Sequence, residues 1–226
     1  MCVSYWGIWL ICAGVPLLFG LWAQARVKST FNRYSQVPTH NGMTGNDAAA
    51  AVLRASGLDG VSIHPVPGRL TDHYDPRSRT LNLSQDVGLA ATVAAVGVAA
   101  HEAGHAIQDA DHYRPMRIRQ TLVPAAQFGQ SLWFLPVLIG LVVGATGLVT
   151  IGLILFSAVV LFQLITLPVE FDASKRALAA LESQGLLAAT EVDGARAVLS
   201  AAALTYVAGF VASLGQLIYF FLLSRR

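Results

Sequence analysis

Two histidines and a glutamate stand together in an otherwise apolar stretch, VGVAAHEAGHAIQDA, which covers residues 96–110. His101, Glu102 and His105 form the pattern H-E-x-x-H. On a helix, residues four apart share a face, so both imidazoles can bind one zinc ion. Glu102 would lie beside that ion, where it can accept a proton from water as a general base. Because unpaired ionisable groups are costly to bury, a bound Zn2+ explains this pattern better than a chance pair of histidines.

A catalytic zinc ion usually has three protein ligands, and the sequence offers three candidates for the third position. Asp111 lies six residues after His105, but that arrangement needs a glycine where this chain has Gln108. His112 follows one residue later, and a histidine there is more often a plain surface residue. Glu170, in the segment LPVEFDASKRAL, is the preferred candidate because it is flanked by apolar residues at the end of an expected membrane crossing. The alternative for Glu170 is a carboxylate in the first turn of a helix, where the helix dipole favours negative charge.

The composition indicates a membrane protein. The chain has 226 residues, of which 54% are hydrophobic and 12% charged, and its mean hydropathy is +0.56. Soluble domains usually contain about 25% charged residues. The formal net charge is only +2, and no basic stripe with interleaved aromatic residues appears, so nucleic acid is not an expected partner.

Four segments are long and apolar enough to cross a bilayer, which requires about 20 residues as a helix. The expected transmembrane helices cover residues 5–24, 132–148, 149–167 and 204–223. The two middle helices come from one run without charged residues, with a tight turn expected near 144–150. In the first segment, Ala23-Gln24-Ala25 resembles a signal-peptide cleavage site, but no Lys or Arg precedes it, so a membrane anchor is preferred.

The positions of the basic residues predict the orientation in the membrane. All Lys and Arg residues except Arg225 and Arg226 lie in or beside the two polar regions, 25–131 and 168–203. The positive-inside rule therefore predicts both regions in the cytoplasm and the N-terminus outside. The two intervening crossings return the chain to its starting side, so Glu170 can meet the two histidines.

The first polar region is expected to be an α+β catalytic region. A helix capped by Thr44 or Asn46 should end at Gly57. Strands are expected for VSIHPVP and RTLNLS, with a turn at DPRS. A long helix rich in Ala and Gly should follow Ser84 or Asp86 and carry the H-E-x-x-H motif.

The second polar region, 168–203, is expected to be a helix, a turn and a second helix. Pro168 suits the first position of a helix, because its missing N–H would be unsatisfied there in any case. Thr190 is a candidate cap for the second helix. On this prediction Glu170 stands near the start of a new helix.

Residues near the DPRS turn are candidates for contact with a substrate. His73 and Tyr74 could orient a peptide or steady its oxyanion, although polar residues of a hairpin also simply face water. The strand RTLNLS could offer an edge to an extended peptide, although an ordinary strand of a small sheet needs no such role.

Four longer segments carry a resemblance to a known family: LTDHYDPRSRTLNLS, VAAHEAGHAIQ, LFQLITLPVEFDASKRAL and GARAVLSAAALTYVA. From about residue 30 to 215 the chain resembles the bacterial YugP-type membrane zinc metallopeptidases. The resemblance implies a mainly α membrane protein, with four transmembrane helices and a small α+β zincin-like catalytic domain. It also implies a zinc-dependent endopeptidase of the bacterial inner (cell) membrane that acts on protein or peptide substrates, including membrane proteins.

Carried over to this chain, the resemblance implies His101 and His105 as zinc ligands, Glu102 as base and Glu170 as the gluzincin-type third ligand. The chain is also distantly similar to HtpX-like membrane proteases, in which an Asp follows the ligand Glu by four residues. Here that position is Ser174. Asp172 lies on a different helical face from that position, so the resemblance gives it no role.

Two other functions are compatible with the sequence. In an intramembrane protease of the site-2 type, the segment 87–107 would itself cross the bilayer, and Leu58-Asp59-Gly60 would match its aspartate motif. A metal-stabilised membrane scaffold would bind zinc and recruit membrane-protein partners without cleaving anything. The complete set of base and ligands favours the peptidase.

Overall fold

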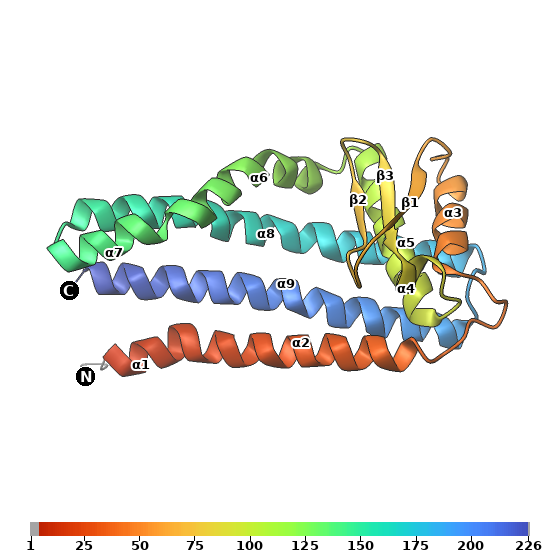
Figure 1. Cartoon of the computed structure of the whole chain (residues 1–226), viewed down its shortest axis with the longest axis horizontal. Helices are drawn as coiled ribbons and strands as arrows, with labels where there is room; N and C mark the ends of the chain where they lie inside the picture. Colours follow the sequence, from red (N-terminus) through yellow and green to blue (C-terminus); the bar gives the residue numbers. More distant parts are fainter. Residues whose placement is uncertain (1–4, 226) are drawn as a thin grey trace. The chain divides into compact units, whose positions relative to one another are not determined.

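The computed structural model describes residues 5–225, which fall into two compact units. Unit 1 comprises the residues up to 24, 115–168 and those from 204 onward, and unit 2 comprises 25–114 and 169–203. Each unit therefore combines segments that are far apart in the sequence. The elements shown in Figure 1 are, in chain order, α1 (Tyr5–Trp9), a π-helical turn (Leu10–Gly14), α2 (Val15–Tyr34), α3 (Gly45–Ala55), β1 (Ser62–Val66), β2 (His73–Asp75), β3 (Thr80–Ser84), α4 (Gln85–Gly88), α5 (Val93–Ala110), α6 (Arg114–Leu132), α7 (Phe134–Val143), α8 (Thr146–Ser183) and α9 (Ala189–Ser224).

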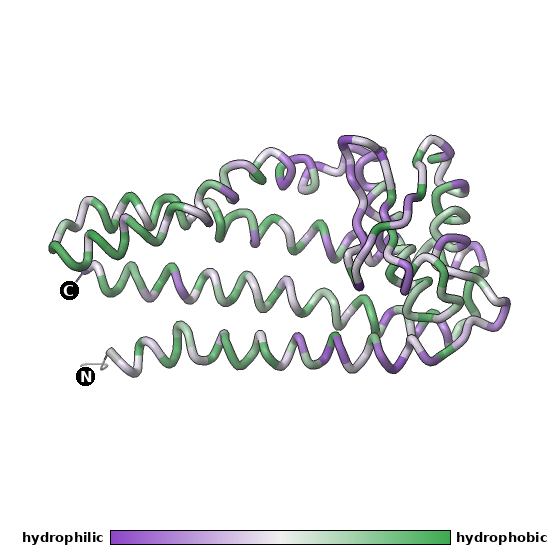
Figure 2. Tube along the Cα trace, in the orientation of Figure 1, coloured by the Kyte–Doolittle hydropathy of each residue, from purple (hydrophilic) through white to green (hydrophobic). Residues whose placement is uncertain are grey.

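Unit 1 contains the most apolar parts of the long helices. Figure 2 shows nearly continuous apolar colouring along α7 and the adjoining part of α8. Many large apolar side chains here are exposed, among them Leu135 at 59% and Ile154 at 66%, as expected for a surface that contacts lipid. Four helical stretches are long and apolar enough to cross a membrane: Trp6–Tyr34, Arg114–Val143, Thr146–Ser183 and Ala189–Ser224.

The turn between α7 and α8 is closed by glycine. Gly144 has a φ of 72° and ends α7 in the left-handed conformation that glycine adopts without strain. Within unit 1, the beginning of α1 and the end of α9 lie at the same end as this turn (Figure 1). Thr146 and Arg225 line one pocket, which places the end of α9 beside the start of α8. This arrangement is the one that four successive crossings require.

Unit 2 packs a three-stranded sheet and α3 against α5. The strand order is β1-β3-β2, with β1 parallel and β2 antiparallel to β3. Thr44 caps α3 as predicted, and it forms a reciprocal capping box with Asp47. The core of unit 2 includes these fully or almost fully buried side chains: Val52, Leu81, Leu83, Val93, Val96 and Leu181. The expected fold class, a mainly α membrane protein with four crossings and a small α+β part, is confirmed.

In the first polar region the structure excludes one possibility and shows that one prediction is wrong. RTLNLS forms β3, which lies between the other two strands, so it has no free edge for a peptide. The helix that carries the motif begins at Val93 and not directly after Ser84, because residues 91–93 pair with the 37–39 segment before the helix starts. Thr92 then caps α5 through its side-chain oxygen, which accepts a hydrogen bond from the N–H of Ala95 at 3.3 Å.

The second polar region also differs from the prediction. Pro168 lies inside α8, which continues without a break from the apolar segment to Ser183. The missing N–H of Pro168 removes one helical hydrogen bond, a loss that long membrane helices tolerate. Glu170 is consequently in a helix interior, where the helix dipole cannot explain a buried carboxylate. Thr190 is not a helix cap, because α9 begins at Ala189. The Glu191 carboxylate instead accepts a hydrogen bond from the N–H of Ala188, the residue before the helix.

Candidate metal centre

Helix α5 presents the H-E-x-x-H residues from the interior of unit 2. His105 and Glu102 are buried, and the His101 side chain is 13% exposed. Gly104, between the two histidines, lets α8 approach closely, since a Cβ added there would lie 2.5 Å from the backbone oxygen of Ala173. This contact brings Glu170 to the two imidazoles.

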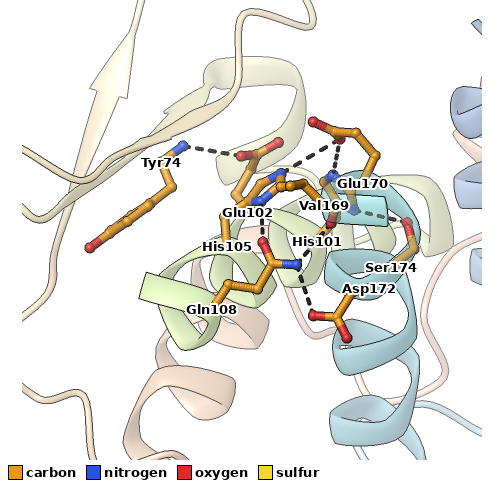
Figure 3. Close-up of polar contacts among 9 residues, drawn as sticks. All are labelled: Tyr74, His101, Glu102, His105, Gln108, Val169, Glu170, Asp172 and Ser174. Atoms are coloured by element: carbon orange, nitrogen blue, oxygen red, sulfur yellow. Dashed lines mark hydrogen bonds and ion pairs between the residues drawn. The ribbon is translucent and has the colours of Figure 1, made fainter. Parts of the chain in front are cut away.

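The three candidate ligands face one another. The Nε2 atom of His101 lies 3.3 Å from Oε2 of Glu170, and Nε2 of His105 lies 3.6 Å from the same oxygen. One ligand atom from each of the three residues lies within 4.8 Å of the others. Ligand atoms about 2.0–2.2 Å from a tetrahedral zinc ion are about 3.3–3.6 Å apart, so these separations fit one ion. Figure 3 shows the imidazoles from α5 and the carboxylate from α8 converging.

The outer nitrogens of both imidazoles are held by further hydrogen bonds. Nδ1 of His105 lies 3.0 Å from Oε1 of Gln108, and Nδ1 of His101 lies 3.1 Å from Oγ of Ser174. The amide of Gln108 is oriented in turn, because its Nε2 donates to the backbone oxygen of Val169 at 2.8 Å. Its carbonyl oxygen therefore faces His105, so Nδ1 of His105 is the donor and Nε2 keeps its lone pair in the neutral ring.

Asp172 belongs to the same network. Nε2 of Gln108 donates a second hydrogen bond to Oδ2 of Asp172, at 2.8 Å. The guanidinium of Arg176 donates to Asp172 at 2.6 Å and also to Asp111. Asp172 thus links Gln108 on α5 to α8 without contacting either imidazole.

The pKa values of His105 and Tyr74 are both shifted upward. Burial by itself lowers the pKa of the His105 imidazole, but the nearby carboxylates of Glu170 and Glu102 raise it by more, so the net direction is upward. Burial and the charge of Asp109 raise the pKa of the Tyr74 phenol above its ordinary range. Tyr74 is therefore protonated at neutral pH, and its hydroxyl donates to Asp109 at 3.0 Å.

Glu102 is oriented by the sheet. Its Oε2 accepts a hydrogen bond of 3.1 Å from the backbone N–H of Tyr74, on the edge strand β2 (Figure 3). The phenol of Tyr74 points away from the imidazoles toward Asp109. The ring of His73 is exposed, and its Nδ1 donates to the backbone oxygen of Thr71 at 2.9 Å.

Neither of the other two candidates for the third ligand belongs to this group of side chains. Asp111 is paired with Arg176, and both Asp111 and His112 are exposed. Within residues 5–225, the one group of three or more His, Cys, Asp or Glu side chains close enough to share an ion consists of His101, His105 and Glu170.

The sequence prediction missed Gln108 and Gly104. Gln108 lies three residues after His105, a spacing at which side chains on a helix meet, so its amide could have been recognised as a partner of that imidazole. Gly104 could have been recognised as a small residue on the face that carries the metal ligands.

Comparisons with known proteins assign the chain to a family. A family model described as "Putative neutral zinc metallopeptidase" matches residues 9–225. The chain belongs to this family. The "Putative membrane protease YugP" of Bacillus subtilis (strain 168) is 45% identical to it over 213 residues, which cover 94% of each chain. No solved structure matches the chain significantly.

Membership of the zinc metallopeptidase family confirms the resemblance seen in the sequence. The family name, together with the candidate site of His101, His105 and Glu170, suggests zinc as the metal. The membrane protease relative agrees with the four apolar helices.

Proposed function

We propose that this chain is a membrane-anchored zinc endopeptidase, in which His101, His105 and Glu170 hold the ion and Glu102 is the general base. One observation carries the proposal: the three ligand atoms have separations of 3.3 and 3.6 Å around a shared carboxylate oxygen, inside a buried helix pair. Two neutral imidazoles and one carboxylate are a donor set that catalytic zinc uses. Other divalent ions accept imidazole and carboxylate as well, so the family name supports zinc in particular.

Zinc, when bound, makes water acidic enough to ionise near neutral pH and polarises a peptide carbonyl. The residues of the chain transfer the proton and hold the reacting groups in position. The carboxylate of Glu102 accepts the proton of the attacking water at Oε1 or Oε2 and delivers it to the nitrogen of the leaving amine. The backbone N–H of Tyr74 keeps this carboxylate on the β2 side of the helix.

Gln108 and Ser174 act as positioning residues in this proposal. Gln108 fixes the ring of His105 by accepting from Nδ1–H, and the hydroxyl of Ser174 contacts the equivalent nitrogen of His101. Each contact leaves Nε2 turned toward Glu170. Such partners orient metal-binding imidazoles and raise their basicity.

The substrate is a protein or peptide. The edge strand β2 is next to Glu102 and offers main-chain groups to an extended chain. The exposed ring of His73 on this strand is a candidate for contact with that chain, whereas Tyr74 would act through its main chain. The positive-inside pattern supports a catalytic unit in the cytoplasm of a bacterial cell whose inner membrane holds the four helices.

The structural observations favour this function over the two alternatives. Helix α5 packs in unit 2 among α3 and the sheet, which does not suit a helix that crosses the bilayer. Leu58-Asp59-Gly60 follows the end of α3 in a turn and is not among the groups that could share an ion within the described chain. A non-catalytic scaffold would need the ligands but would have no use for a buried Glu102 beside them.

The first prediction concerns Glu102. In Glu102→Gln, zinc binding should be retained while hydrolysis of a fluorogenic peptide falls by about 10²–10⁴-fold, the usual contribution of a general base. Zinc content by mass spectrometry and hydrolysis rates are measured on the purified full chain. Glu182→Gln, an exposed carboxylate on α8, is the matched control and should keep full activity. Unchanged hydrolysis by Glu102→Gln would show that Glu102 is not the general base. Absence of hydrolysis in every form of the zinc-loaded chain would favour the non-catalytic scaffold.

A further inference from the structure

A pocket of about 770 Å3 lies between α6, α8 and α9 in unit 1. Its walls include aromatic rings and small residues, but four glutamines also contribute to it: Gln127, Gln130, Gln163 and Gln216. All four belong to segments of unit 1, and none takes part in the candidate metal centre.

The four amides come from three different helices. Gln127 and Gln130 are three residues apart on α6 and share a face of that helix. Gln163 comes from α8 and Gln216 from α9. Helix α6 packs closely on α8, since a Cβ added at Gly129 would lie 2.5 Å from the backbone oxygen of Leu155. The convergence of amides from separate helices is therefore a property of the folded unit and not of one polar helix face.

The hydroxyls of this pocket are satisfied, and the amides are not. Oγ of Ser131 donates to the backbone oxygen of Gln127 at 2.9 Å, and Oγ of Ser213 donates to that of Gly209 at 2.9 Å. Gln127 and Gln130 are exposed and Gln163 and Gln216 are half-buried, and none of their side-chain amides is hydrogen-bonded to another residue of the described chain, so the amides are open to whatever fills the pocket. In a bilayer, amides left without partners are costly. The pocket therefore favours an occupant that brings both donors and acceptors.

The chemistry of the pocket favours a polypeptide over a lipid headgroup. An amide side chain has the same donor and acceptor groups as a peptide bond. No residue that lines the pocket carries a formal charge, so a phosphate has no counter-charge there; Arg119 lies 5.9 Å from the Phe162 ring but is not part of the lining. A regular transmembrane helix satisfies its own peptide groups, whereas an interrupted one exposes some of them. The rings of Trp133 and Phe156 provide apolar contact beside the amides.

We propose that this pocket binds a transmembrane segment of a membrane-protein substrate at a point where the helix of that segment is interrupted. The four amides pair with the peptide groups that the interruption leaves free. This inference rests on the proposed function, because it names the substrate class of the peptidase. The binding step itself needs no cleavage, so the two can be tested separately.

The test uses the full chain with Glu102→Gln, in nanodiscs of phosphatidylethanolamine and phosphatidylglycerol. The probes are two fluorescent 23-residue transmembrane peptides of Leu and Ala, one with a central Asn-Pro pair and one without. The interrupted peptide should bind at least tenfold more tightly. Adding Gln163→Leu and Gln216→Leu should abolish this preference. Gln24→Leu, the same change at an exposed position on α2 outside the pocket, should preserve it.

Equal binding of the two peptides, or a preference that survives the double substitution, would overturn the proposal. Retention of phosphatidylglycerol that depends on the glutamines, without any preference between peptides, would also overturn it and indicate a lipid site. If the double variant is not monodisperse, the single variants Gln163→Leu and Gln216→Leu replace it, each with at least a threefold loss expected. Cleavage of a soluble peptide by the chain with Glu102 intact tests the proposed function independently.

Discussion

Gln108 is the residue on which the orientation of His105 depends. It is fully buried, it contacts Nδ1 of the imidazole at 3.0 Å, and its own amide is fixed by Val169 and Asp172. Replacing this amide with an apolar side chain of similar length leaves a buried N–H without a partner and frees the ring to rotate.

We therefore predict that Gln108→Met weakens zinc binding by about 10–100-fold, the usual effect of losing such a partner. Competition with a chromogenic chelator measures the affinity. Gln85→Met, at an exposed position on α4, is the matched control and should bind zinc like the unaltered chain. Equal affinity of Gln108→Met would show that the amide does not hold the ring.

Among the residues of the site, the sequence predicted those whose spacing along one helix is informative. His101, Glu102 and His105 follow from the helical period alone. Glu170 followed from the return of the chain through two crossings and from its apolar neighbours. The contacts of Ser174 and Asp172 were not predictable, because they depend on the rotation of α8 about its axis relative to α5, which no local pattern records.

The crossing of α5 and α8 within unit 2 is the element-scale feature that assembles the centre. Gly104 permits it, because any Cβ there would meet the backbone oxygen of Ala173 at 2.5 Å. Backbone atoms cannot rotate away as a side-chain end can, so the helices themselves must separate. Glu170 would then move away from the imidazoles.

Gly104→Ala should therefore lower zinc affinity by at least tenfold and destabilise the chain by about 1–3 kcal/mol, the usual cost of overpacking. Gly97→Ala on the same helix is the control. Its new methyl group would meet the side chain of Ala195 at 3.2 Å, which needs a shift of only a few tenths of an ångström. Calorimetric titration with zinc and thermal unfolding report the two effects. If Gly104→Ala binds zinc as tightly as Gly97→Ala, the close approach is not what positions the ligands.

The helices and strands were predictable where local sequence determines their bounds. They were not predictable where contacts with distant segments determine them. The Thr44 cap, the DPRS turn and the strands in VSIHPVP and RTLNLS followed from local sequence, whereas the short strand β2 was not predicted. Pro168 misled the prediction, because α8 continues through it as one long helix. The start of α5 also could not be predicted, since it depends on pairing of residues 91–93 with a segment about 50 positions earlier.

For the whole molecule, the main prediction is the orientation of the chain in the membrane. In a chain with Cys2→Ser and Cys12→Ser, we expect Thr146→Cys to react with an impermeant maleimide in intact spheroplasts. Gly60→Cys and Pro115→Cys should react only after permeabilisation, because both belong to the expected cytoplasmic region. If labelling places residues 60 and 115 on opposite sides of the membrane, this orientation is contradicted and the intramembrane protease is favoured.

In the proposed site, one zinc ion joins α5 to α8. The most direct test is an anomalous difference map at the zinc edge from crystals of the full chain. We predict a single peak about 2.0–2.2 Å from Nε2 of His101, Nε2 of His105 and a carboxylate oxygen of Glu170. A peak completed by a different third side chain, with Glu170 beyond bonding distance, would contradict the proposed ligand set.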